Sequence, residues 1–135
     1  MRHRVFGRPY IVLVSPFADE VELYSTYLRA AGFLVKAFGR TTPALRSIRR
    51  HPPDAVITRI RQATGEPDGL TLAARLREHS ELALIPVLVL TTSIDPRDHA
   101  SAATLECEAV MMLPTTPDEL VERLTAALRA RGSRT

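Results

Sequence analysis

A positively charged side chain, Arg59, directly follows a short apolar run. Residues 55–58, AVIT, are apolar or β-branched and predict a buried strand, and Arg59 follows them directly. The planar guanidinium is a permanent positive charge that suits carboxylates and phosphates. Three roles are open for Arg59: a solvated side chain over the edge of the sheet, the partner of a nearby carboxylate, or a ligand of an external anion.

The other residue types that carry chemistry are not arranged for it. Cys107 is the only cysteine, which excludes an internal disulfide framework, and nothing near it predicts a reactive thiol. The sequence has no Ser-His-Asp order and no glycine-rich phosphate loop. The four histidines lack the spacing of metal ligands: His3, His51, His79 and His99. We therefore expect no catalytic residue, metal or cofactor, and a protein that is not an enzyme.

Size and composition indicate one globular domain. The chain has 135 residues, of which 45% are hydrophobic and 24% charged. No apolar run approaches the roughly 20 residues that cross a bilayer, so we expect a cytoplasmic protein without membrane contact. The net charge is +3, and Lys36 is the only lysine among 18 basic residues. The arginines are scattered apart from those of the tail, which does not favour a nucleic-acid-binding surface.

Strand-like and helix-like segments alternate along the chain. The apolar runs are short and mostly continuous, which is typical of strands covered on both faces: 10–14, 33–37, 55–60, 86–90 and 109–113. Helical spacing appears between them, for example at Leu70, Ala73 and Ala74. Asp95, Thr42 and Thr116 each precede a proline and are predicted to cap helices. This order predicts a parallel sheet with helices on both faces. The domain is expected to span 9–130, with flexible ends at 1–8 and 131–135.

Several stretches together resemble the receiver domain of bacterial response regulators. They are "YIVLVSPFADEVELYSTYLRAAGFLV", "PPDAVITRI", "PDGLTLAARLRE", "IPVLVLTT" and "MMLPTTPDEL". The ordered set is specific, whereas each piece alone is weak. The resemblance implies a flavodoxin-like (βα)5 fold, a doubly wound parallel sheet with strand order 2-1-3-4-5. It also implies a site at the switch point between the first and third strands.

The residues aligned with the functional site of the receiver family differ in type from those that the family uses. Receivers place two acids that hold Mg²⁺ where this chain has Ser15 and Pro16. Their phosphoacceptor aspartate corresponds to Arg59, and their lysine to Leu113 before Pro114, a bond that the resemblance implies is cis. Two further positions are the hydroxyl residue, kept as Thr91, and the switching aromatic, replaced by Val110. The pattern predicts a degenerate pseudo-receiver that has lost phosphotransfer and its metal.

Function is then expected to pass through contact with another protein. We expect a stand-alone signalling module that binds a kinase, an effector or a second copy of itself through the face formed by residues 94–130. The alternative is a sensor that binds an anionic small molecule at Ser15, Arg59 and Thr91. A weaker alternative is nucleic-acid association through the arginines of the tail. If Arg59 instead pairs with a carboxylate of the chain, the candidates are Asp19, Glu20, Glu66 and Asp68.

Overall fold

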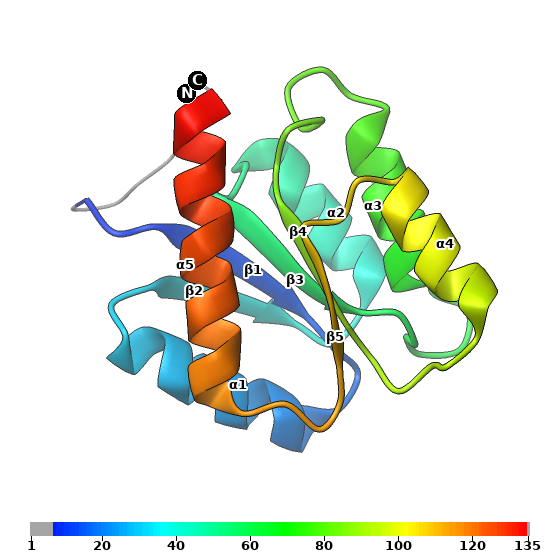
Figure 1. Cartoon of the computed structure of the whole chain (residues 1–135), viewed down its shortest axis with the longest axis horizontal. Helices are drawn as coiled ribbons and strands as arrows, with labels where there is room; N and C mark the ends of the chain where they lie inside the picture. The colour runs from blue at the N-terminus through cyan, green and yellow to red at the C-terminus, as the bar shows by residue number, and fades with distance from the viewer. Residues whose placement is uncertain (1–6, 135) are drawn as a thin grey trace.

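The computed structural model describes residues 7–134, with side chains described as far as Arg131. The five strands form one parallel sheet in the order β2-β1-β3-β4-β5, as predicted (Figure 1). Their bounds are β1 Tyr10–Val14, β2 Leu34–Phe38, β3 Ala55–Arg59, β4 Val87–Thr91 and β5 Ala109–Met112. β3 and β4 are buried at every position, which explains their continuous apolar sequence.

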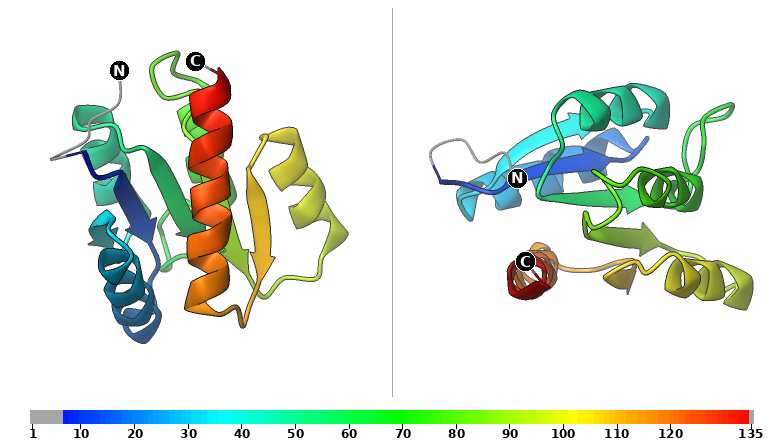
Figure 2. Two further views of the ribbon diagram at one scale, coloured as in Figure 1. Left: turned by 60° about the vertical axis from the view of Figure 1, so that its left-hand side comes forward. Right: turned by 90° about the horizontal axis from the view of Figure 1, so that it is seen from above.

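Five helices cover the two faces of this sheet (Figure 2). Their bounds are α1 Ala18–Ala30, α2 Thr41–Arg50, α3 Gly69–Arg77, α4 Pro96–Thr104 and α5 Pro117–Arg134. α1 and α5 lie side by side on one face, and α2, α3 and α4 lie on the other. The strands deliver alternate side chains to two cores: Ile11 and Leu13 of β1 pack toward α1 and α5, and Val12 and Val14 toward α2 and α3.

Two of the three predicted helix caps are present. The Asp95 carboxylate accepts a hydrogen bond from the Arg97 amide, and the Thr116 hydroxyl accepts one from the Glu119 amide. The Thr42 cap is wrong, because α2 begins one residue earlier, at Thr41, with Arg40 in the cap position. The Thr41 hydroxyl donates to the Pro67 carbonyl and the Glu66 carboxylate accepts from the Thr42 amide, so a distant loop takes over the capping.

Two other predicted features differ from the structure. The buried stripe of α3 is Leu72, Ala73 and Leu76, whereas Leu70 and Ala74 are only half-buried. The C-terminal end at 131–134 is helical rather than a loose end, because Arg131 is buried and donates to the Asp54 carbonyl. Residues 1–6 and 135 of the predicted flexible ends lie outside the described residues.

Candidate functional site

The candidate site lies where the carboxyl ends of the central strands meet. Ser15 directly follows β1, Arg59 closes β3 and Thr91 closes β4. In a parallel sheet the carboxyl ends of the strands lie at the same edge. β1 and β3 are neighbours in the sheet, although β2 lies between them in the sequence. The fold therefore brings together the three positions that the sequence singled out.

Arg59 pairs with Glu20, which is one of the four carboxylates that the sequence offered. Its Nε atom lies 3.4 Å from Glu20 Oε2, and its guanidinium carbon lies 4.5 Å from the centre of the Phe17 ring. Arg59 is only 8% exposed, so it is not the solvated side chain of the first alternative. A buried guanidinium needs a counter-charge, and Glu20 supplies it from the first turn of α1.

Ser15, which the resemblance aligns with a metal-binding acid, completes this network. Its hydroxyl donates to Glu20 Oε2 at 2.7 Å and accepts from the Phe17 amide at 3.2 Å. The Ser15 side chain is fully buried, so its hydroxyl is committed to these two partners. Pro16, the second position of the acid pair, is half-buried and offers no side-chain oxygen.

Thr91 forms a hydrogen bond in the turn after β4, whereas the Leu113 side chain lines a hollow beside Arg59. The buried Thr91 hydroxyl accepts from the Ser93 amide at 2.9 Å and so stabilises the turn into α4. The Leu113 amide donates to the Thr91 carbonyl, and the Leu113–Pro114 peptide bond is cis, as predicted. The side chain of Leu113 and the Pro114 ring line a hollow beside Arg59.

Gln62 is a site residue that the sequence did not reveal. Its amide nitrogen donates to the Val14 carbonyl, the Thr58 hydroxyl and the Arg59 carbonyl, at 3.3, 3.2 and 2.9 Å. It thereby ties the loop after β3 to the ends of β1 and β3. No local pattern marks Gln62, since its partners belong to strands that only the fold brings together.

The Asp-Gly pair before α3 fits closely against the same loop. The Asp68 carboxylate caps α3 by accepting a hydrogen bond from the Thr71 amide. Gly69 donates its amide to the Ile60 carbonyl, and a Cβ atom at this position would clash with the Arg59 backbone. A glycine is thus required here by close backbone approach.

These residues do not fit the Mg²⁺ ion of the receiver family. The resemblance aligns the positive guanidinium of Arg59 with a carboxylate that would bind the metal, and Glu20 already pairs with Arg59 and accepts from Ser15. Among residues 7–131, no group of three or more His, Cys, Asp or Glu side chains is close enough to hold a metal ion.

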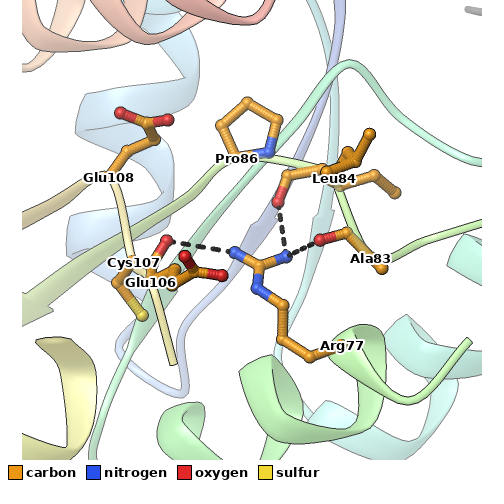
Figure 3. Close-up of a pocket in the computed structure, with 8 residues that line it drawn as sticks. Arg77, Ala83, Leu84, Pro86, Glu106, Cys107 and Glu108 are labelled. Atoms are coloured by element: carbon orange, nitrogen blue, oxygen red, sulfur yellow. Dashed lines mark hydrogen bonds between the residues drawn. The ribbon is translucent and has the colours of Figure 1, made fainter. Parts of the chain in front are cut away.

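A second hollow lies at the opposite edge of the sheet and is built around Arg77 (Figure 3). The Arg77 guanidinium donates to four backbone carbonyls, those of Ala83, Ile85, Leu105 and Glu106, at 2.9–3.3 Å. Arg77 therefore clamps the chain before β4 to the chain before β5. Cys107 lines this hollow, and burial raises the pKa of its thiol, which agrees with an unreactive cysteine.

Two large apolar side chains are exposed on the face formed by residues 94–130. Ile94, in the loop before α4, is 85% exposed, and Met112, at the end of β5, is 42% exposed. Met111, the residue before Met112, is buried in the core, because successive strand residues point to opposite faces. Such exposed apolar residues are typical of contact sites when they gather on one face.

Comparison with known proteins gives one consistent family. A model of the response regulator receiver domain matches residues 11–125. The transcriptional regulatory protein GltR of Pseudomonas aeruginosa is 30% identical over 119 residues, which cover 88% of this chain and 48% of GltR. The DNA-binding response regulator MtrA of Mycobacterium tuberculosis is 30% identical over 122 residues, covering 90% and 51%. The chain spans about half the length of these curated relatives.

Solved structures agree on the fold. A CheY-like receiver domain protein from Methanospirillum hungatei has a TM-score of 0.88 at 14% identity and covers 96% of this chain and 100% of its own. The chemotaxis protein CheY4 of Vibrio cholerae has a TM-score of 0.82 at 19% identity, covering 90% and 99%. At these identities the likeness establishes the flavodoxin-like fold. No helix within residues 7–134 is long and apolar enough to cross a membrane.

Proposed function

Because the chain belongs to the response regulator receiver family, we propose that it serves two-component signalling as a pseudo-receiver, without being phosphorylated itself. The observation that carries this proposal is the ion pair of Arg59 with Glu20 at the end of β3. Phosphoryl transfer to a receiver needs a carboxylate nucleophile and a divalent metal. Arg59 supplies neither, and its charge opposes the metal.

The proposal is tested by an attempt to phosphorylate the protein. The chain is incubated with acetyl phosphate and Mg²⁺, alongside a receiver of the family that keeps its aspartate, and intact masses are measured. We expect no phosphoryl adduct on this chain. Arg59→Asp alone is expected to stay unmodified as well, because Ser15, Pro16 and Leu113 still replace the acid pair and the lysine. A phosphoryl adduct on a side-chain carboxylate of the wild-type chain would refute the proposal.

The signal is then proposed to pass by protein–protein contact through the face of residues 94–130. Exposed Ile94 and Met112 support this face as the contact site. The partner is a kinase, an effector or a second copy of the chain. In this proposal the protein acts in the cytoplasm, has no catalytic step, metal or cofactor of its own, and does not bind nucleic acid.

A matched pair of variants tests the contact face. Ile94→Asp places a charge on the proposed face, and Leu84→Asp places the same charge on a 61% exposed leucine before β4. We expect Ile94→Asp to abolish capture of a partner from the native host, or self-association in sedimentation experiments, while Leu84→Asp preserves it. Equal behaviour of the two variants would exclude this face.

The alternative of an anion sensor at Ser15, Arg59 and Thr91 gains only partial support. The hydroxyls of Ser15 and Thr91 already have partners, and carboxylates of Asp19 and Glu20 line the hollow beside Arg59. Those carboxylates disfavour a ligand that is only an anion.

A further inference from the structure

Arg59 is buried with its hydrogen-bonding capacity unused. The Nε atom of Arg59 is buried without a hydrogen-bond partner, and its contact with Glu20 at 3.4 Å is an ion pair without hydrogen-bond geometry. The terminal nitrogens form no hydrogen bond with residues 7–131 and are not among the buried atoms. A buried charged donor without an acceptor is costly, and native proteins rarely keep one. Glu20 supplies the counter-charge of Arg59, and the terminal nitrogens remain available to an acceptor from outside the protein.

The guanidinium faces a hollow of about 410 Å³ at the carboxyl edge of the sheet. Three kinds of wall surround this hollow. Arg59 supplies the positive wall, with Thr92 as a further polar residue, and Asp19 and Glu20 supply the negative wall. The apolar wall consists of Leu23, Tyr24, Leu113 and Pro114. The first turn of α1 begins beside it, so the partial positive charge of that helix end adds to Arg59.

We propose that this hollow binds a small zwitterion, an α-amino acid with an apolar side chain. The ligand carboxylate accepts hydrogen bonds from the terminal nitrogens of Arg59, which Glu20 leaves free. The ligand ammonium lies against Asp19, whose carboxylate has no hydrogen bond or ion pair within residues 7–131. The apolar side chain packs on Leu23, Leu113 and Pro114.

Charge and size both select this class of ligand. An anion alone is repelled by Asp19 and Glu20, and a cation alone is repelled by Arg59, whereas an α-amino acid carries both charges a few ångströms apart. The volume lies within the range of roughly 300–1,000 Å³ that is usual for small-molecule sites. Leu113, at the position of the family's lysine, makes the third wall apolar. This proposal does not depend on the proposed protein contact.

The experiment is an amide NMR titration of the full chain with L-leucine, raised to ~10 mM because so small a ligand binds weakly. We expect saturable shifts of the amides of residues 19–24, 59, 113 and 115. Three analogues each lack one feature: N-acetyl-leucine lacks the ammonium, leucinamide lacks the carboxylate, and glycine lacks the apolar side chain. Each is expected to bind at least about tenfold more weakly than L-leucine.

Two exposed carboxylates provide matched variants. Asp19→Asn removes the proposed ammonium partner, and Asp118→Asn removes a carboxylate from the first turn of α5. We expect Asp19→Asn to weaken L-leucine binding about tenfold and Asp118→Asn to leave it unchanged. Absence of saturable shifts with L-leucine, equal binding of N-acetyl-leucine, or equal effects of the two variants would overturn the proposal. Neither variant alters the core, so loss of folding does not confuse the result.

Discussion

At the scale of single residues, the site is held by side chains whose partners are all local to one edge of the sheet. Arg59 and Ser15 share the Glu20 carboxylate, and Gln62 ties the following loop to β1 and β3. The positive charge of Arg59 and the negative charge of Glu20 cancel within the protein. This edge of the sheet therefore needs no external cation, unlike an acid cluster that has to bind one.

Gly69 offers a direct test of how tightly this edge is packed. Gly69→Ala is expected to destabilise the protein by about 1–3 kcal/mol, because the added Cβ would displace the Arg59 backbone. The measurement is urea unfolding followed by circular dichroism. Gly39→Ala is the control, since no atom lies within 4 Å of its Cβ position, and it should change stability by less than about 0.5 kcal/mol. Equal stability of the two variants would contradict the close approach.

At the scale of elements, the loops that lead into β4 and β5 contain a left-handed residue, Glu106, and the carbonyls bound by Arg77. The connection before β5 contains Glu106, whose φ of 56° lies in the left-handed region, directly after the C-cap of α4. The neighbouring Arg77 clamp holds this connection to the one before β4 (Figure 3). The two features together set how β4 and β5 enter the sheet.

A substitution of Arg77 by lysine removes most of its hydrogen bonds to the backbone carbonyls while keeping a long, charged side chain. Arg77→Lys keeps the charge but cannot reach four carbonyls in the same fork geometry, so we expect a loss of roughly 2–4 kcal/mol in unfolding free energy. Hydrogen exchange should also quicken in residues 83–86 and 105–108. Arg75→Lys, an exposed position on the same helix, is the control and should be close to neutral. If Arg75→Lys matched Arg77→Lys in both readouts, the clamp would not be the cause.

Replacing Glu106, the residue with a left-handed backbone, is predicted to raise the stability of the protein rather than lower it. Glu106→Gly is expected to stabilise the protein by about 0.5–1 kcal/mol, because glycine adopts this conformation without steric cost. Glu106→Ala removes the same carboxylate but keeps the Cβ atom, so it should bring no gain. Thermal unfolding of the three proteins checks this, and a gain in Glu106→Ala equal to that of Glu106→Gly would point to charge instead of backbone strain.

At the scale of the whole molecule, the receiver fold is present, and the proposed pseudo-receiver implies that the parts that would switch it have changed. Val110, which the resemblance aligns with the switching aromatic of the family, is half-buried against the core formed with α2 and α3. The Thr91 hydroxyl is held by the Ser93 amide. A two-state switch needs a ligand that distinguishes the two states, and a phosphoryl group at Arg59 is not expected.

We therefore predict that the face of residues 94–130 keeps one conformation. Amide NMR spectra recorded with beryllofluoride and Mg²⁺ should show no saturable shifts across this face. A family receiver that keeps its aspartate is the positive control and should respond. Saturable shifts across 94–130 would reveal a switch, and shifts restricted to Ser15, Arg59 and Thr91 would favour an anion site.

The sequence alone determined the alternation of strands and helices and the residues at the strand ends. Runs of apolar residues and caps such as Asp95 and Thr116 are local signals, so they can be predicted without knowledge of the fold. The Thr42 cap and the buried stripe of α3 were misjudged because tertiary neighbours, the 66–67 loop and the sheet, decide them.

Only the tertiary structure decided which partner each site residue has. The sequence offered four carboxylates to Arg59, and the position of α1 against the end of β3 selected Glu20. The same placement directed Ser15 to Glu20 and brought Asp19, Leu23 and Leu113 around one hollow. Gln62 and Arg77 bind backbone carbonyls far apart in the chain. Such contacts depend on how elements pack in three dimensions, which local spacing does not encode.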